Sequence, residues 1–519
     1  MFNWFKKIAL VEKVKPVQDV AAIGDPLTPL ALSESVAFKD QGNVYLNNGK
    51  LEEAAECFRQ AIARNPRYAE AYTNLGLVFQ MQGNLDEAIA LYRKAVMLKP
   101  DLLTAHMNLG IALLEAKHLP EAEASYRRAL ELKPDYAGAH NNLAILLVEA
   151  KRLPEAEASY RRALELKHDY VEAHNNLGLM LLEARRLPEA EASYRRALEL
   201  QPDYVDAHHN LGLLPPSLGD MQAGWGEFEW RWATSQFIMA RRDFAQTQWR
   251  GEAAEGRTLL IHAEQGFGDT LQFCRYASLA AARGLRVIME VQAPLVRLLR
   301  SLPGVDLVVG AGEQLPAFDL HCPMLSMPLA LGTTLATIPS SRSYLQADRV
   351  QVDAWRTRLA ALPNKGGHRI GLVWEGNPRP EFPQFTGDRQ RSMDPAQLAP
   401  LFDLPGFHFF SLQKGGAAAP EDFPLTDFMD EMGDFADTAA LIANLDLVIS
   451  FDTAVAHLAA ALGKPVWMLE RFDSCWRWLR EREDSPWNPS LRQFRQPKPG
   501  DWQAVIERVV EELYHKDRL

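Results

Sequence analysis

Two short segments in the second half of the chain carry side chains that could handle a proton and a phosphate. The first is GFGD at residues 266–269, which follows the apolar run TLLIHAEQ. A carboxylate such as that of Asp269, placed where a strand passes into a helix, could accept a proton from an attacking hydroxyl. Aspartate is also among the best residues for capping a helix N-terminus, so the same position has a purely structural interpretation.

The second segment is DTAVAH at residues 452–457, which follows the apolar run DLVIS and opens a predicted helix. The free N–H groups and the positive dipole end of a helix N-terminus suit a phosphate. Asp452 and Thr453 stand at that end, and Thr453 adds a hydroxyl. His457, one turn into the helix, could donate to a diphosphate or to a sugar oxygen. The alternative is a capped helix with a buried histidine.

Basic and aromatic residues elsewhere in this half are further candidates for a binding site. Arg389 and Arg391 lie in GDRQRSM, and Lys414 follows the run HFFSLQ. A guanidinium fork matches phosphate oxygens well, although each of these cations could be an ordinary surface charge. Trp476 and Arg477 could stack on a base or a sugar, and a tryptophan in such a stretch can equally belong to the core.

Gly266 and Gly268 also match the first two glycines of a dinucleotide-binding turn, with Glu290 about where a ribose-binding acid would stand. The third glycine of that turn is missing, because its position holds Leu271. No Gly-Lys-Ser/Thr sequence follows, which excludes a phosphate-binding P-loop. Alone, the turn predicts tight packing of a strand against a helix.

Both segments lie in a region that alternates short apolar runs with helical stretches, the pattern of parallel α/β sheets. The first set of predicted strands is TLLIHAEQ, RVIMEV and VDLVVG, and the second is RIGLVW, HFFSLQK, DLVISFD and PVWMLE. We predict two Rossmann-like lobes that face each other across a cleft, with ligands at the carboxyl ends of the strands.

The first half of the chain is repetitive. The segment LPEAEASYRRALEL occurs three times, beginning at Leu119, Leu153 and Leu187. This spacing of 34 residues, with small residues at fixed offsets, is typical of tetratricopeptide repeats, in which each unit is a pair of helices. We predict five full repeats from Ser35 onward and a sixth, from Val205, that degenerates after its first helix. The tryptophans of the degenerate part are predicted to cap the last apolar face.

One position of the repeats carries asparagine five times, at Asn74, Asn108, Asn142, Asn176 and Asn210. A solenoid would stack these residues into a ladder of side-chain amides, which can donate to the carbonyls and accept from the N–H groups of a peptide. We therefore predict an acceptor-peptide-binding face. The alternative is that the asparagines cap or bridge neighbouring helices.

Histidines recur as well, at His106, His140, His174 and His208. Packed helices lie about 8–10 Å apart, whereas zinc ligands must each come within about 2.1 Å of one ion, so a shared metal site is excluded. We expect these histidines to make polar or stacking contacts in the same groove as the asparagines.

Bulk properties predict several domains and a soluble, cytoplasmic protein. The 519 residues are too many for one core, and a net charge of -11 argues against broad nucleic-acid binding. Four dispersed cysteines fit a reducing cytosol, and no apolar run is long enough for a transmembrane segment. We divide the chain into an N-terminal extension (1–34), the repeats (35–238), a first lobe with its linker (239–348) and a second lobe (349–519).

From about Thr258 to Leu513 the sequence resembles the bacterial heptosyltransferase family of GT-B glycosyltransferases, through GFGD, RIGLVW and DTAVAHLAAALGKP. The resemblance implies that Asp269 is the catalytic base and that Asp452, Thr453 and His457 contact a nucleotide-sugar diphosphate. The sequence departs from the family at Ala454, where a glycine is usual, and it lacks the lysine expected after RIGLVW. HAEQGFGDTLQFCRY, SLQKGG and WRWLREREDSPW resemble bacterial tetratricopeptide proteins that carry this domain, and the layout resembles that of O-GlcNAc transferases.

We therefore predict an α plus α/β protein, a tetratricopeptide solenoid followed by a GT-B-like pair of lobes, that transfers a sugar from a nucleotide sugar to an acceptor hydroxyl. The expected reaction is inverting and needs neither metal nor cofactor, and the expected acceptor is a protein or peptide bound by the repeats. Two alternatives stay open: a non-catalytic scaffold with a decayed transferase domain, and a heptosyltransferase-like enzyme acting on lipopolysaccharide or glycan. The repeats also leave room for a homo-oligomer.

Overall fold

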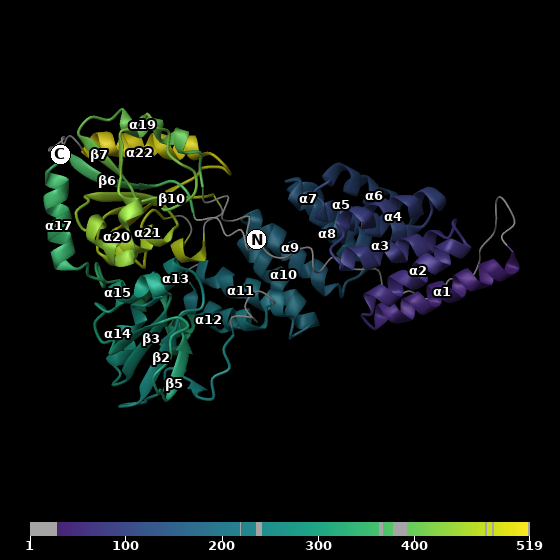
Figure 1. Ribbon diagram of the computed structural model, residues 1–519, viewed down its shortest axis with the longest axis horizontal. Helices are drawn as coiled ribbons and strands as arrows, with labels where there is room; N and C mark the ends of the chain where they lie inside the picture. The colour runs from purple at the N-terminus through teal and green to yellow at the C-terminus, as the bar shows by residue number, and fades with distance from the viewer. Residues whose placement is uncertain are drawn as a thin grey trace. The chain divides into compact units, whose positions relative to one another are not determined.

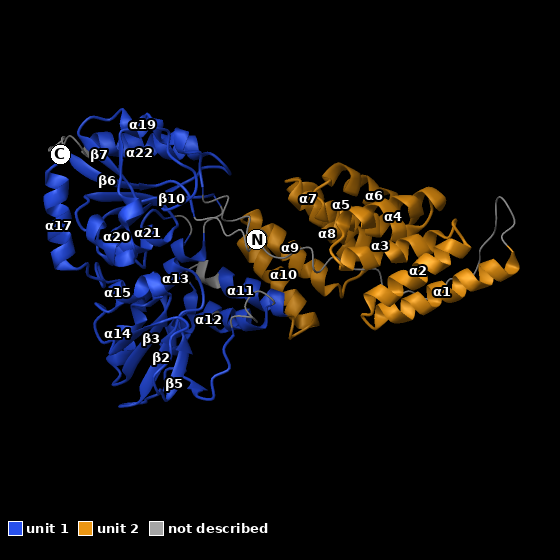
Figure 2. Ribbon diagram, viewed as in Figure 1, with its two compact units in different colours: residues 1–2, 205–519 blue, residues 3–204 orange. Residues whose placement is uncertain are grey.

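The computed structural model describes residues 28–217, 220–234, 241–362, 367–376, 392–472, 475–479 and 482–516. The described chain divides into two compact units, the first ending at Tyr204 and the second beginning at Val205. Figure 1 labels the elements and Figure 2 colours the two units. The first unit is helical throughout its described residues and the second contains both parallel sheets, so the fold class is an α solenoid followed by α/β lobes, as predicted.

The first unit consists of antiparallel helix pairs. Its helices are α1 (Pro29–Asn47), α2 (Leu51–Arg64), α3 (Ala69–Met81), α4 (Leu85–Leu98), α5 (Leu103–Glu115), α6 (Leu119–Leu132), α7 (Ala137–Glu149), α8 (Leu153–Leu166), α9 (Val171–Glu183) and α10 (Leu187–Leu200). Each pair closes where an aromatic ring of the second helix lies on a small residue of the first. In the third pair Tyr126 is fully buried, and a Cβ on Gly110 would come within 2.6 Å of its ring. Small residues there let the helices approach closely.

The turn inside each repeat needs one residue with left-handed backbone. Gly49 and Gly83 occupy this position in the first two repeats, with φ of 71° and 84°. Lys117, Lys151 and Arg185 occupy it in the next three, with φ of 63°, 60° and 61°. Left-handed backbone costs a non-glycine residue about 1 kcal/mol or more, so the three near-identical repeats carry strain that the first two avoid.

The second unit begins with a sixth helix pair, α11 (Val205–Ser217) and α12 (Met221–Phe228), followed by the 3₁₀ turn η2 (Glu229–Ala233). The sequence pattern predicted only the first of these helices, because the two glycines in MQAGWGEF disfavour a helix locally. Trp225 is buried, its indole N–H donates to the carbonyl of Thr333 over 2.9 Å, and its ring meets Trp476 edge-on at 5.4 Å. Trp225 therefore fastens the sixth pair to the α/β part of its own unit.

The first lobe is a five-stranded parallel sheet in the order β1-β5-β2-β3-β4. Its strands are β1 (Thr247–Gln248), β2 (Thr258–His262), β3 (Arg286–Val291), β4 (Leu307–Gly310) and β5 (Leu320–Pro323). Its helices are α13 (Phe267–Phe273), α14 (Tyr276–Ala281), α15 (Val296–Leu299) and α16 (Met327–Ala330). Every residue of β2 is buried, as expected for a parallel strand at the centre of a covered sheet.

The second lobe is a six-stranded parallel sheet in the order β11-β10-β9-β6-β7-β8. Its strands are β6 (His368–Val373), β7 (Phe407–Ser411), β8 (Leu425–Asp427), β9 (Leu447–Phe451), β10 (Val466–Glu470) and β11 (Leu491–Arg495). Its helices are α17 (Arg349–Ala360), α19 (Ala399–Phe402), α20 (Phe435–Ile442), α21 (Ala454–Ala461) and α22 (Trp502–Lys516), and the 3₁₀ turn η8 is Trp476–Trp478. No helix in the described ranges is long and apolar enough to cross a membrane.

Each sheet reverses its strand order once, and such a switch point is where open α/β sheets place their ligands. In the first lobe the reversal is between β5 and β2, and α13 follows β2. In the second lobe it is between β9 and β6, and α21 follows β9. One hydrophobic core includes residues of both lobes, among them Leu271 of α13 and Leu458 of α21. The packing thus brings the two helices that follow the switch points together.

Candidate active site

Asp269 lies in the first turn of α13, directly after β2 and its loop. Gly266 is the N-cap of this helix, and its N–H donates to Oδ2 of Asp269 over 3.2 Å. Asp269 is thus not the N-cap itself, as the structural interpretation had it, but the third helical residue, whose side chain accepts from the N-cap N–H as in a capping box. The other oxygen, Oδ1, accepts a hydrogen bond from Nη2 of Arg477, which belongs to the second lobe. Both oxygens of Asp269 are engaged, and its side chain is 20% exposed.

Arg477 stands in η8 with its side chain 13% exposed. Its Nη1 donates to Sγ of Cys475 over 3.1 Å, and its guanidinium lies 4.7 Å above the ring of Trp476. Burial alone would lower the pKa of Arg477, but the negative charges of Asp269 and Asp452, with Cys475, raise the pKa above its ordinary value. The site therefore holds a permanent cation close to one carboxylate from each lobe.

His457 lies one turn into α21 and is 5% exposed. Its Nε2 shares a hydrogen bond of 3.2 Å with Oδ1 of Asp452, and its ring stacks on Trp478 at 5.4 Å. Its Nδ1 is buried and has no hydrogen-bond partner in the described part of the chain. A Cβ on Gly268 would stand 2.9 Å from Cδ2 of His457, so glycine is what allows α13 and α21 to meet here.

Thr453 is the N-cap of α21, with φ of −127° and ψ of 167°. Its hydroxyl does not cap the helix and instead shares a hydrogen bond of 2.9 Å with the hydroxyl of Ser450 at the end of β9. Because the side chain of Thr453 makes no capping bond, the N–H groups it would have capped at the start of α21 suit an anion. Ala454, the departure from the family pattern, is the first helical residue.

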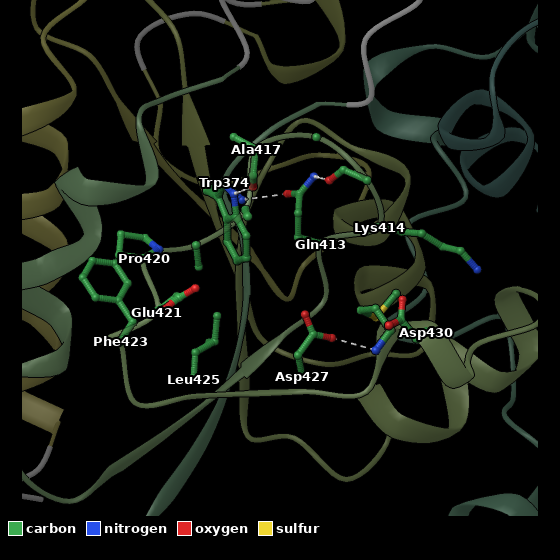
Figure 3. A pocket seen from close by; sticks show the side chains of 15 residues that line it. Trp374, Gln413, Lys414, Ala417, Pro420, Glu421, Phe423, Leu425, Asp427 and Asp430 are labelled. Atoms are coloured by element: carbon green, nitrogen blue, oxygen red, sulfur yellow. Dashed lines mark hydrogen bonds between the residues drawn. The ribbon is translucent and has the colours of Figure 1, made fainter.

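A pocket of about 540 Å³ opens beside this region, at the carboxyl ends of β6, β7 and β8 (Figure 3). The indole N–H of Trp374 donates to the carbonyl of Ala417 over 2.8 Å, and the side-chain amide of Gln413 donates to the carbonyl of Gly415 over 2.9 Å. These bonds hold the loop after β7 in shape. The lining includes three carboxylates, those of Glu421, Asp427 and Asp430. This charge repels phosphate but suits hydroxyl and amino donors.

Lys414 also lines the pocket, but its side chain points away from Trp374 in Figure 3, and its Nζ donates to the carbonyl of Met432. Trp476 is 9% exposed, and its ring packs against Trp225 and Trp487, so it belongs to the core rather than to a stacking surface. Arg389 and Arg391 lie outside the described residues.

Glu290, the acid of the dinucleotide alternative, is 4% exposed at the end of β3 and is paired with Arg242. Its carboxylate is therefore turned into an internal ion pair. Among the described residues no group of three or more His, Cys, Asp or Glu side chains is placed to hold a metal ion.

Sequence reasoning missed Arg275, which is 3% exposed and joins the lobes. From the end of α13 its guanidinium donates to the hydroxyl of Tyr344, to the carbonyl of Trp487 and to Oδ1 of Asn488, over 2.6 to 2.8 Å. The detectable signal was an arginine as the one charged residue in the mainly apolar stretch LQFCRYASLAA. A buried charge in such a stretch must find several partners, because leaving it unpaired is very costly.

The asparagine ladder is more buried than the sequence suggested. Asn142 is fully buried, and Asn74, Asn108 and Asn210 are less than a tenth exposed. The amide of Asn74 donates to Oδ1 of Asn43 over 2.8 Å. A second chain of bonds, each 3.2 Å, runs from Asn176 to Asn141 and from Asn141 to Asn142. These bonds show the bridging of helices that the alternative interpretation expected, and peptide binding by the ladder stays a prediction.

The repeated histidines also have local partners. Nε2 of His106 lies 3.0 Å from the carbonyl of Pro100, and Nε2 of His140 lies 3.0 Å from that of Pro134. His208 instead pairs with Glu227 and stacks on Trp230 at 4.0 Å. His106 and His140 thus fasten the loop that leads in from the preceding repeat, and His208 fastens the second helix of its own pair.

Comparison with known families supports both halves of the description. Residues 39–102, 107–170 and 141–205 match the tetratricopeptide repeat, and residues 431–497 match glycosyltransferase family 9 (heptosyltransferase). The second match contains Thr453, His457 and Arg477 but does not reach Asp269.

Protein FlbA of Caulobacter vibrioides is 28% identical over 333 residues, which are 57% of this chain and 53% of FlbA. The chain thus spans about half the length of that relative. Solved structures similar to the chain include PilF of Pseudomonas aeruginosa, with 22% identity, coverage of 38% of this chain and 90% of PilF, and a TM-score of 0.35. They also include YrrB, titled a TPR protein with an unusual peptide-binding site, with 24% identity, coverage of 36% and 95%, and a TM-score of 0.29. The chain therefore carries tetratricopeptide repeats in its N-terminal region and, late in its second lobe, a stretch that matches glycosyltransferase family 9.

Proposed function

We propose that this chain is a glycosyltransferase that moves a sugar from a nucleoside-diphosphate donor to an acceptor hydroxyl. The observation that carries the proposal is the meeting of two switch-point helices. α13 brings the carboxylate of Asp269, and α21 brings a helix N-terminus without a side-chain cap, to one place between the lobes. A base and an anion site on facing lobes are the two elements that sugar transfer from a diphosphate requires.

The donor fits the second lobe in a definite orientation. Its diphosphate would lie at the start of α21, near Thr453 and within reach of the Arg477 cation. Its nucleoside would enter the acidic pocket, whose carboxylates can accept hydrogen bonds from ribose hydroxyls or base amino groups. Neighbouring strands are about 4.8 Å apart, so the ends of β9 and β7, separated by β6, are about 10 Å apart. A nucleoside diphosphate can span that distance.

The chemistry would proceed by direct displacement. Asp269 takes the proton of the acceptor hydroxyl, the acceptor oxygen bonds to the anomeric carbon, and the bond from that carbon to the diphosphate breaks with its electron pair leaving on phosphate. Arg477 and the N–H groups of α21 would stabilise that leaving charge. A single displacement inverts the anomeric centre, and we propose that it needs no metal, with His457 and Asp452 holding the start of α21 in shape.

The repeats supply the acceptor in this proposal, as a protein or peptide. A glycan or lipid acceptor, with the repeats serving only assembly, is the variant closest to the family 9 match. A non-catalytic scaffold is favoured by a different observation: both oxygens of Asp269 are occupied and His457 is almost fully buried.

The test has two parts. Wild type and Thr453→Val are screened by thermal shift against nucleotide sugars, and we expect one of them to raise the melting temperature of the wild type more than that of the variant. Intact masses of proteins from cells with the gene, without it, and with Asp269→Ala are then compared. Sugar adducts seen only with the wild-type gene support protein glycosylation. Altered lipopolysaccharide with unchanged protein masses supports the glycan acceptor, and no nucleotide-sugar binding supports the scaffold.

A further inference from the structure

Arg477 is placed where two different anions can use it. Among the described residues, its hydrogen bonds go to Oδ1 of Asp269 and to the sulfur of Cys475, and sulfur is a weak acceptor. A guanidinium has five N–H donors in a fixed fork, and two phosphate oxygens match that fork better than one carboxylate oxygen and a thiol do. The present partners therefore leave Arg477 open to exchange.

Asp269 is in the opposite situation. Its Oδ2 is held by the N–H of Gly266 inside its own helix, so Oδ1 is the atom left for an acceptor hydroxyl. That atom is the one Arg477 occupies. An oxygen that already accepts a hydrogen bond from the guanidinium has no room for an acceptor hydroxyl on that side. As long as the pair is intact, Asp269 is blocked.

We propose that Arg477 exchanges Asp269 for the donor diphosphate, and that this exchange releases Oδ1 of Asp269 to act as the base. The inference rests on the proposed function and adds an order to it: the donor must bind before the acceptor can be deprotonated. Arg477 thereby couples a site on the second lobe to a base on the first. During transfer the acceptor proton passes to Oδ1, and Arg477 stays on the departing diphosphate.

The exchange predicts a particular pattern of nucleotide affinity. The nucleotide must compete with Asp269 for Arg477, so removing the charge of Asp269 should make binding tighter. Dissociation constants are measured by calorimetry for UDP, GDP, ADP and dTDP with wild type, Asp269→Asn, Arg477→Gln and the double variant. For the nucleotide that binds, Asp269→Asn should tighten binding about tenfold or more, which is the size of one hydrogen bond to a charged group. Arg477→Gln should weaken binding by a similar factor.

The double variant separates the exchange from simple repulsion. If Asp269 acts through Arg477, adding Asp269→Asn to Arg477→Gln changes nothing. If Asp269 merely repels the diphosphate through space, the substitution Asp269→Asn should tighten nucleotide binding by the same factor in the wild type and in Arg477→Gln. That result would show that the proposal is wrong. The corresponding nucleosides, which have no phosphate, should bind wild type and Asp269→Asn alike.

A second ion pair between the lobes provides a control for the possibility that Asp269→Asn acts by loosening the lobes. Arg297 of α15 pairs with Asp434 and Asp437 across the lobes and is 45% exposed. Arg297→Gln should leave the nucleotide affinity unchanged, and if it tightens binding as much as Asp269→Asn does, lobe opening is the cause and the exchange is refuted. Thermal unfolding checks that each variant folds, and Arg477→Lys, which keeps the charge without the fork, should bind with intermediate affinity. A nucleotide that binds wild type without any coupling refutes the exchange alone, whereas no binding to any of these proteins refutes the proposed function with it.

Discussion

Replacing Glu264 by glutamine is expected to lower the free energy of unfolding of the second unit by about 3 to 5 kcal/mol. Glu264 is the second residue after β2, and its side chain is only 1% exposed. Its carboxylate accepts from Nε and Nη2 of Arg231, over 2.9 and 3.0 Å, and from the N–H of Leu325 over 2.9 Å. Arg231 is fully buried, so neither member of this pair can turn to water when the other is lost.

The magnitude follows from those three bonds. Glutamine keeps one oxygen and replaces the other by an NH₂ group, so at least one N–H of Arg231 or Leu325 would face a donor instead of an acceptor. Each hydrogen bond to a charged group contributes about 1.5 to 3 kcal/mol. The buried guanidinium would keep the carboxylate of Glu229 as its charged partner, beside the carbonyl of Phe228 and the hydroxyl of Ser326. Glu229→Gln is the matched control, because Glu229 is 23% exposed and Arg231 keeps its two bonds to Glu264. We expect that control to lose about 1 kcal/mol.

Urea unfolding followed by tryptophan fluorescence measures this loss in the full chain. Of the 12 tryptophans only Trp4 precedes Trp225, so the signal reports the second unit. Arg231→Met combined with Glu264→Gln should lose less stability than the two single variants added together, because it leaves no fully buried unpaired charge, and Glu229, which loses its partner, is 23% exposed. Equal losses for Glu264→Gln and Glu229→Gln, or strict additivity in the double variant, would refute the reasoning.

Three further predictions concern single contacts. Tyr126→Phe should raise repeat stability by up to about 1 kcal/mol in urea unfolding followed by circular dichroism, because its buried hydroxyl has no partner in the described chain; Tyr92→Phe, whose hydroxyl bonds Gln80 over 2.9 Å, should lower it by about 1 kcal/mol. Gly83→Ala should lower the free energy of unfolding of the repeats by about 1 kcal/mol, because φ at this position is 84° and left-handed backbone disfavours alanine. An added Cβ would meet no neighbouring atom, so this backbone cost is the whole expected effect. Burial, with neighbouring positive groups, lowers the pKa of His262 to about 3, so only the unfolded chain takes up that proton as pH falls from about 6.5 to about 3. The free energy of unfolding of the wild type should therefore fall as the pH is lowered from 7 to 4.5. In His262→Phe this fall should be smaller by about 2 to 3 kcal/mol.

The repeats and the central strands could be predicted because their signals are local. A spacing of 34 residues fixes the helix pairs, and β2, β6 and β9 are each built on a short, mainly apolar run, as is typical of buried parallel strands. The strands that were missed lie away from the centre of a sheet or are very short. β11 reads LRQFR, with charged and polar residues at an edge, and β8 has three residues. Patterns of apolar residues cannot mark strands of that kind.

In the candidate site, too, the local features could be predicted from the sequence and the contacts between distant residues could not. The positions of Asp269 and Thr453 follow from a strand that ends and a helix that begins, which sequence shows. The pairing of Asp269 with Arg477 joins residues 208 apart, and it depends on how two lobes pack. The core position of Trp476 and the burial of Asn142 depend on packing in the same way. Residue type identified these as candidates, but only tertiary structure decides which of them face a ligand.

The capping and catalytic interpretations of Asp269 are compatible, because a carboxylate has two oxygens. Oδ2 caps α13 through Gly266, and Oδ1 is the atom proposed for catalysis. Two substitutions separate these roles. Asp269→Asn keeps an oxygen that can cap the helix but loses the base, whereas Asp269→Ala loses both, so the alanine variant should be less stable by about 1 kcal/mol while transfer fails in each. Residual transfer by Asp269→Asn near the wild-type rate would show that the aspartate serves the helix alone.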